Sequence, residues 1–435
     1  MPHLLIEQDR QYLWRPYTSH DDHQRLDPLV VCEANGVWIV DASGKRYLDG
    51  NGSWWTNTLG HAHPRLRAAL KRQVDSLAHC AFAGITHAPA VELAKDLLAV
   101  APPGLKRVFF SDNGSTAVEV ATKIAFQYWQ QNGRPERRRF LALSHAFHGD
   151  TLGASSLGGI PAFRAIFGPL LFDVIRAPEP TSQRTYKQVI EGVIAELTSR
   201  GNEIAGVVVE PLIQGAAGMH MWPAGMLREL GRAIRASETF LIADEVFTGY
   251  GRTGTMWACE QAGLTPDILC VAKAMSGGML PMAATLATAQ VYEGFSGGKE
   301  RALMYGHTYY GNPLGASVAR EVLAIYRDEH VVEQVVQKAP LISAAFERIR
   351  NLPGVRSVRS MGMVGAADLG QGGYAGNAGW AVYTHALRRG AYLRPLGDTV
   401  YIAPPLIISE AELNQLLDIL HDSIVAAYTS GPWQS

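Results

Sequence analysis

The segment TFLIADEVFTGYGRTG (239–254) contains a nearly continuous apolar run that ends in two carboxylates, Asp244 and Glu245. A second run, in DILCVAKAMSGG (267–278), ends at Lys273 and a glycine-rich loop. Short apolar runs rich in β-branched residues are typical of strands buried on both faces of a parallel sheet. Because open α/β sheets bind ligands at the carboxyl ends of their strands, both segments are expected to bring polar groups to one site.

Similar runs at 108–112, 140–144 and 204–211 alternate with helical patterns such as 115–129. This alternation over about 200 residues predicts an α/β sandwich. Residues 30–50 are typical of a meander of short strands, and the last hundred residues change to an α+β pattern. The meander is too short to fold alone and is therefore expected to pack with the C-terminal part.

Composition is that of an ordinary globular enzyme, with 47% hydrophobic and 18% charged residues among 435. The formal net charge of -1 gives no general electrostatic attraction to nucleic acid or anionic membranes. The four cysteines form no CxxC pair, which argues against a disulfide framework or zinc ribbon. The N-terminal residues lack an apolar signal region and no run of eighteen apolar residues occurs, so a cytoplasmic protein is expected.

Lys273 carries the most informative chemistry. Burying an ammonium group is costly, so a lysine at a strand end tends to have a lowered pKa and to act as a nucleophile or condense with an aldehyde. The alternative is a surface lysine whose amine reaches solvent. Asp244 could pair with a protonated ring nitrogen, or it could simply cap a turn.

The segment SDNGSTAVEVATK (111–123) predicts a strand followed by a helix that opens at Asn113, Gly114 and Ser115. The first amides of a helix form a phosphate site, although an ordinary N-cap has the same pattern. A phosphate-binding helix start, a carboxylate and a strand-end lysine are together the three groups that hold pyridoxal phosphate.

These motifs make the whole chain resemble the class III aminotransferases of fold type I. The resemblance is carried, in the family's order, by SDNGSTAVEVATK, SHAFHGDTLGASSLGG, VVVEPLIQGAAGM, ADEVFTGYGRTG, DILCVAKAMSGG and GHTYYGNPLGASVA. It implies a large domain over 63–325 with a mostly parallel seven-stranded sheet between helices. It also implies a smaller α+β domain formed by 1–62 and 326–435.

The resemblance further implies a pyridoxal 5'-phosphate enzyme in which Lys273 is the catalytic residue and holds the cofactor as a Schiff base. Asp244 would pair with the pyridine nitrogen, and Phe147 would stack on the ring. The residues implied to bind the cofactor are Lys273, Asp244, Gly114, Ser115, Phe147, His148, Glu210 and Thr308. Since Thr308 would reach the phosphate of a neighbouring subunit, a homodimer with shared active sites is expected.

Narrower features resemble the members of this family that aminate 8-amino-7-oxononanoate in biotin biosynthesis. They lie in YLWRPYTS (12–19), NGSWWTNTLGHAHP (51–64) and AYLRPLGDTVYIAPP (391–405). Rigid aromatic side chains would enclose the alkyl chain, and an arginine would bind its remote carboxylate with two parallel hydrogen bonds. The implied substrate-binding residues are Tyr17, Trp54, Trp55, Arg394, Tyr401, Gly306 and Arg252.

Two positions depart from the family pattern. Phe147 stands where a tyrosine is usual, and GHTYYGNP (306–313) stands where GPTFMGNP is usual. Both lie near the expected donor or phosphate region, so lysine is kept beside S-adenosylmethionine as the amino donor.

Three alternative functions remain open from the sequence. An ω-amino acid or diamine aminotransferase using pyruvate would keep the cofactor. A metal hydrolase would use the clusters His61-x-His63 and His145-x-x-His148-x-Asp150 as ligands. A catalytically idle relative would bind the cofactor only.

Overall fold

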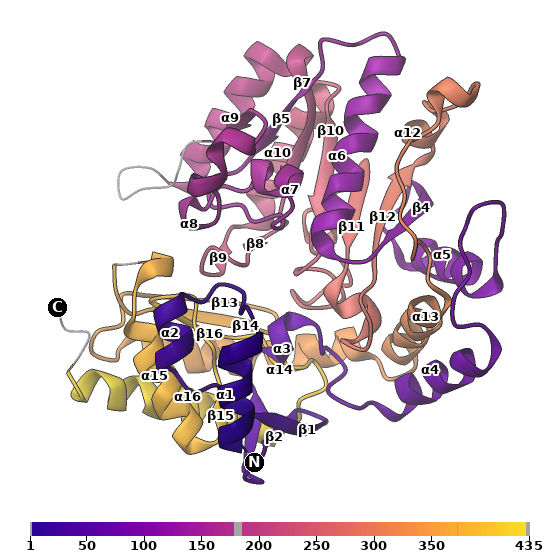
Figure 1. Ribbon diagram of the computed structural model, residues 1–435. Coiled ribbons are helices and arrows are strands. Elements are labelled where there is room, and N and C mark those ends of the chain that lie inside the picture. Colours follow the sequence, from indigo (N-terminus) through magenta and orange to yellow (C-terminus); the bar gives the residue numbers. More distant parts are fainter. Residues whose placement is uncertain (1, 178–184, 372, 432–435) are drawn as a thin grey trace.

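The computed structural model describes residues 2–177, 185–371 and 373–431. Its centre is a seven-stranded sheet in the order β4-β12-β11-β10-β7-β5-β6. Only β12 runs antiparallel to its neighbours in this described sheet, so the predicted mostly parallel sheet is confirmed (Figure 1). The strands are β4 (Leu105–Ser111), β5 (Arg139–Ala142), β6 (Val174–Arg176), β7 (Ile204–Val209), β10 (Phe240–Asp244), β11 (Ile268–Val271) and β12 (Ala283–Thr288).

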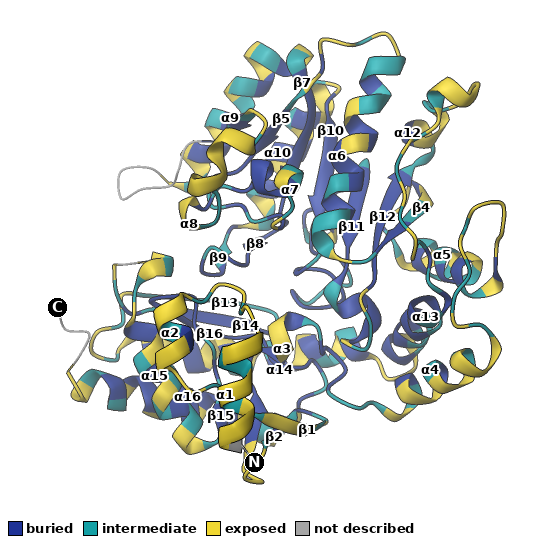
Figure 2. Ribbon diagram, viewed as in Figure 1, coloured by how far each residue is buried: buried dark blue, intermediate teal, exposed yellow. Residues whose placement is uncertain are grey.

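Helices cover both faces of this sheet, which is why its central strands β7, β10 and β11 are buried along their whole length and almost entirely apolar. Along β10, Ile242 packs in one hydrophobic cluster with residues of α6 (Gly114–Gln131), whereas Leu241 and Ala243 pack in the other. The second cluster includes residues of α5 (Ala88–Val100), α9 (Tyr186–Arg200) and α10 (Ala224–Ala236). Because successive side chains of a strand point to opposite faces, two cores follow from one apolar run. Figure 2 shows the buried strands between helices with exposed outer surfaces.

Both ends of the chain build a second lobe, drawn below the large sheet in Figure 1. The N-terminal meander forms β1 (Val31–Asn35), β2 (Trp38–Asp41) and β3 (Arg46–Asp49), and β3 pairs in parallel with β15 (Ala391–Tyr392). A three-stranded sheet of β13 (Ser357–Met361), β14 (Val364–Asp368) and β16 (Thr399–Ile402) completes the strands of this lobe. The β3–β15 pairing brings the segment after residue 49 beside the segment after residue 392.

Long helices connect and cover these sheets. The helix α13 (Pro313–Asp328) packs on α4 (Pro64–Ser76) and α5, and it runs across the predicted domain boundary at 325/326. The second lobe carries α14 (Val331–Arg350), α15 (Ala378–Arg389) and α16 (Glu410–Thr429). Shorter helices are α1 (Pro2–Tyr12), α2 (His20–Arg25), α3 (Gly52–Trp55), α7 (Leu152–Leu157), α8 (Pro161–Arg164), α11 (Ala258–Gln261) and α12 (Ala289–Glu293), and the hairpin β8 (Ile213–Gln214)–β9 (His220–Met221) follows β7. Of the helices within the described ranges, none has the length and apolarity needed to cross a bilayer.

Candidate active site

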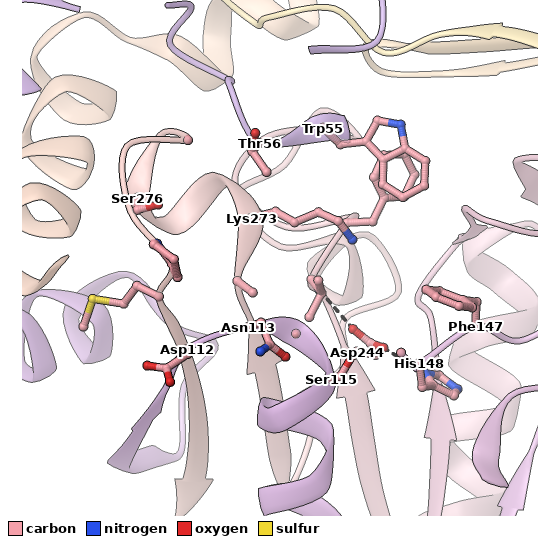
Figure 3. A pocket seen from close by; sticks show the side chains of 18 of the residues that line it. Trp55, Thr56, Asp112, Asn113, Ser115, Phe147, His148, Asp244, Lys273 and Ser276 are labelled. Carbon is pink, nitrogen blue, oxygen red and sulfur yellow. Dashed lines mark hydrogen bonds and ion pairs between the residues drawn. The ribbon is translucent and has the colours of Figure 1, made fainter. Parts of the chain in front are cut away.

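A cavity of about 470 Å³ opens at the carboxyl edge of the large sheet (Figure 3). Asp244 is the last residue of β10, and Lys273 and Glu210 lie just beyond the ends of β11 and β7. Of the predicted site residues, the ones that line this cavity are Lys273, Asp244, Gly114, Ser115, Phe147, His148, Glu210 and Trp55.

Lys273 extends its amine into this cavity, where Nζ lies 4.8 Å from the ring centroid of Trp55. None of the described residues accepts a hydrogen bond from this amine. Burial lowers the pKa of Lys273, and the negative charges of Asp244 and Glu210 act in the opposite direction. The backbone of Lys273 has a φ of 44°, in the left-handed region that costs about 1–3 kcal/mol for a non-glycine residue. A strained residue with a desolvated amine is typical of a reactive lysine.

A second wall of the cavity is formed by Asp244, which pairs with His148. His148 Nδ1 lies 2.8 Å from Asp244 Oδ2, and the backbone N–H of Val246 donates to Oδ1 over 3.1 Å. Both side chains are buried, and a carboxylate can only accept, so the proton of this bond lies on Nδ1. The other ring nitrogen, Nε2, is buried and has no partner among the described residues. The histidine therefore fixes the orientation of the aspartate.

The third wall is the first turn of α6. Asn113 caps the helix: its side chain accepts from the backbone N–H of Thr116 over 3.0 Å, and Thr116 Oγ1 accepts from the Asn113 N–H over 3.2 Å. The amides of Gly114 and Ser115 have no intrahelical acceptor, and they lie at the positive end of an 18-residue helix. Gly149 crosses this turn so closely that a Cβ on it would collide with the Ser115 side chain and lie 2.8 Å from the Ser115 Cα. The arrangement is an open anion cradle.

Glu210 holds the loop that carries Phe147. Its two oxygens accept hydrogen bonds from the backbone N–H groups of Phe147, at 2.9 Å, and Gly215, at 3.0 Å. Burial, with a further contribution from the Asp244 charge, raises the pKa of Glu210 to about 7. Glu210 was expected at the site through resemblance alone. Its hydrogen bonds show that it connects the backbone at Phe147 to the backbone at Gly215.

A second cavity, of about 1510 Å³, is lined by Tyr17, Trp54, Arg394 and Tyr401. Ser53, Trp54 and Trp55 have φ values of 46°, 60° and 72° and form a left-handed turn. This turn directs Trp54 to the second cavity and Trp55 to the first. Trp55 Nε1 donates a hydrogen bond to Tyr401 Oη over 3.2 Å, so the two cavities share one aromatic wall.

Arg394 contributes a cation to this second cavity. Its guanidinium carbon lies 5.3 Å from the ring centroid of Trp54 and 5.7 Å from that of Trp380. Within the part of the chain that the structure describes, no oxygen accepts a hydrogen bond from the guanidinium, which leaves its N–H groups available to an anionic ligand. Tyr17 packs edge-on against Trp54 at 5.7 Å and donates its hydroxyl proton to Asp150.

Three predicted residues lie outside both cavities. Arg252 is buried; its Nη1 donates to the Pro404 carbonyl over 2.6 Å, and burial lowers its pKa to about 10. Gly306 and Thr308 are exposed on the loop before α13. A single chain therefore does not bring Gly306 or Thr308 to Lys273.

The histidines proposed as metal ligands have other partners. His61 Nε2 bonds to Asp49 over 2.9 Å, and His148 bonds to Asp244. Over residues 2–177, 185–371 and 373–431, no group of three or more histidine, cysteine, aspartate or glutamate side chains is placed to hold a metal ion.

Two aromatic residues of this region were not predicted. Phe163 packs against both Tyr17, at 5.6 Å, and Phe147, at 5.4 Å, and Trp380 lies beside Arg394. Neither stands in one of the sequence motifs, so no local signal identified them.

Comparison with known proteins gives a consistent result. The family model "Aminotransferase class-III" matches residues 17–424. An adenosylmethionine-8-amino-7-oxononanoate aminotransferase of Geobacter sulfurreducens is 41% identical, and the match covers 97% of each chain. The crystal structure of the enzyme of that name from Methanocaldococcus jannaschii has a TM-score of 0.93 at 35% identity, over 98% of this chain and 99% of that one. An amine transaminase from an uncultivated Pseudomonas species, in its PLP-bound form, has a TM-score of 0.90 at 31% identity, over 96% and 99%.

Proposed function

The chain belongs to the class III aminotransferases, and on that premise we propose that it is a pyridoxal-phosphate enzyme that transfers an amino group to 8-amino-7-oxononanoate in biotin biosynthesis. The observation that carries the proposal is the convergence of Lys273, the Asp244–His148 pair and the first turn of α6 on one cavity. A homodimer in the cytoplasm is part of the proposal.

The residues present fit pyridoxal phosphate. Gly114 and Ser115 would bind the phosphate through the helix start, in a cradle that a Cβ at Gly149 would fill. Asp244 would hold the protonated ring nitrogen, Phe147 would cover the ring, and Lys273 would hold the aldehyde carbon. When bound, the cofactor supplies an aldehyde that condenses with amines and a ring that withdraws electrons from the substrate.

Lys273 is proposed to move the proton. Because burial lowers its pKa, a larger fraction of its Nζ is neutral near pH 7 and can accept a proton from the donor's carbon. The same Nζ would then give this proton to the carbon that carried the cofactor's aldehyde, which leaves the amine neutral again. The Asp244–His148 bond holds the carboxylate in position while this happens. Trp55, which lies over Nζ, would exclude water from the amine.

The second cavity is proposed to bind the acceptor. Tyr17 and Trp54 offer apolar ring surface for an alkyl chain, and Arg394 offers a guanidinium without a bonded carboxylate in the described chain. Gly306 and Thr308 are exposed and separate from this chain's own cavities, which supports their reaching the site of a partner subunit in a dimer. Arg252 would act by holding the Pro404 loop rather than by touching substrate.

S-adenosylmethionine is the proposed amino donor, because that compound is part of the name shared by relatives such as the Geobacter enzyme. The similarity to an amine transaminase favours one second candidate, an ω-transaminase using pyruvate.

A donor screen tests the assignment. Holoenzyme is incubated with 8-amino-7-oxononanoate and one donor at a time, which is S-adenosylmethionine, lysine or β-alanine, and the diamine product is measured by mass spectrometry. A further incubation contains β-alanine and pyruvate. Product with S-adenosylmethionine supports the proposal, and product with lysine alone would change only the donor. Consumption of β-alanine with pyruvate, without any diamine, would favour the ω-transaminase. Sedimentation analysis of the holoenzyme tests the dimer.

A further inference from the structure

Arg394 is held by two indole rings rather than by a counter-charge. Trp54 and Trp380 lie 5.3 and 5.7 Å from its guanidinium carbon, and both line the same cavity as the arginine. Trp54 comes from the left-handed turn near residue 53, whereas Trp380 comes from the first turn of α15, more than 300 residues later. The pair is therefore assembled by the tertiary structure.

The first turn of α15 is fixed to the loop that carries Arg394. Asp398 Oδ1 accepts a hydrogen bond from the Ala378 N–H over 3.0 Å, and the Gly397 carbonyl accepts one from the Gly379 N–H over 3.2 Å. A Cβ at Gly379 would collide with the Gly397 carbonyl and with Pro395. Because residues 394–398 are contiguous, these contacts set where Trp380 lies relative to Arg394.

We propose that Trp380 is a positioning residue for Arg394, which it holds beside Trp54 so that the guanidinium N–H groups face a carboxylate of the acceptor. This inference rests on the proposed function, in which Arg394 binds the acceptor's remote carboxylate. An indole face attracts a guanidinium and occupies none of its N–H donors. A carboxylate partner would neutralise the arginine and compete with the substrate, whereas two rings fix the cation and leave its hydrogen bonds for the ligand.

The arrangement also accounts for the exposure of Trp380. Trp380 is 38% exposed, although its ring packs edge-on against that of Tyr383 at 5.4 Å. The exposed part of the indole borders the cavity that holds Arg394. The predicted specificity is for acceptors with an apolar chain that ends in a carboxylate.

The experiment measures steady-state kinetics of the holoenzyme for Trp380→Ala, Trp380→Phe, Arg394→Ala and the double variant. Loss of one cation–π contact should raise the acceptor KM about five- to tenfold for Trp380→Ala, with kcat and the donor KM nearly unchanged. Trp380→Phe keeps a ring and should recover most of the affinity. In the Arg394→Ala background, Trp380→Ala should add less than about a twofold effect, because coupled residues are not additive.

Tyr292→Ala is the matched control. Tyr292 also lies over an arginine, with the Arg107 guanidinium carbon 4.4 Å from its centroid, and it is exposed outside both cavities. This variant should leave the acceptor KM unchanged.

If Arg394→Ala raises the acceptor KM and Trp380→Ala does not, the inference about Trp380 is overturned and the proposed function stands. Additive effects of the two substitutions would overturn the inference in the same way. If neither substitution changes the acceptor KM, the assignment of Arg394 to the acceptor fails, and the role of Trp380 fails with it.

Discussion

Replacing Gly149 by alanine tests the anion cradle directly. Gly149 has a φ of 124°, and a Cβ there would lie 2.8 Å from the Cα of Ser115, in addition to colliding with its side chain. Because the nearest groups include backbone, rotation of one side chain cannot relieve the collision. The first turn of α6 must move, and the hydrogen bond from the Asp150 N–H to Ser115 Oγ, 3.2 Å long, must break.

The expected magnitude follows from the bonds that move. Displacing the helix start weakens one or two hydrogen bonds to a charged ligand, each worth about 1.5–3 kcal/mol. The dissociation constant for pyridoxal phosphate should therefore rise by about 10- to 100-fold. Titration of the apoprotein with pyridoxal phosphate, followed by the visible absorbance of the bound cofactor, measures this change.

Gly104→Ala controls for backbone strain. Gly104 has a φ of 103°, and a Cβ there would make an ordinary contact of 3.4 Å with the Thr265 methyl group. Both substitutions place alanine at a strained positive φ, so both should lower stability by about 1–3 kcal/mol. Only Gly149→Ala should weaken cofactor binding. Unchanged binding in Gly149→Ala, or equal weakening in Gly104→Ala, would refute the placement of the phosphate at this helix start.

Three further predictions concern the same site. Lys273→Ala should abolish the absorbance band of the Schiff base between this lysine and the cofactor and lower the transamination rate by about 10⁴-fold; a rate near that of the wild type would contradict the role of this amine. Burial raises the pKa of Glu210 from 4.5 to about 7, so the folded apoprotein binds more protons than the unfolded chain between these values. This carboxyl stabilises the fold fully below about pH 4.5, and its contribution is lost as the pH rises through about 7. Glu210→Gln should therefore reduce the loss of stability between about pH 5 and 8, by at most about 3 kcal/mol in urea unfolding; parallel pH profiles for the two proteins would count against it. Phe147→Tyr should change donor efficiency and leave acceptor KM nearly constant, because Phe147 lines the cavity of Lys273 and not that of Arg394; an unaltered donor profile would argue against a donor-side position.

The sequence predicted the layout of the large sheet because burial on both faces leaves a pattern in every strand. The runs that end at Asp244 and Lys273 became neighbouring parallel strands β10 and β11, which pair from Ile242 with Ile268 to Asp244 with Cys270. Parallel pairing places both strand ends at one edge, so two polar residues 29 positions apart were expected at one site. The helix start at Gly114 could be predicted for a different reason, because its cap is encoded locally by Asn113 and Thr116.

The second cavity could be predicted only as a set of residue types. Trp54, Tyr17 and Arg394 were singled out through resemblance, without any means of placing one against another. Trp380 and Phe163 carried no local signal, because a single aromatic residue on a helix is compatible with many environments.

The sequence by itself thus determined which strands are buried and which polar residues stand at their ends, since these depend on hydrophobic periodicity and local capping. The tertiary structure alone decided the direction of each side chain at the second cavity. Parallel pairing of β3 with β15 brings residue 49 beside residue 392, and the left-handed turn from Ser53 to Trp55 then sends adjacent tryptophans to different cavities. Pairing between distant strands, and a strained turn held by its surroundings, are products of the whole fold, and no window of sequence encodes them.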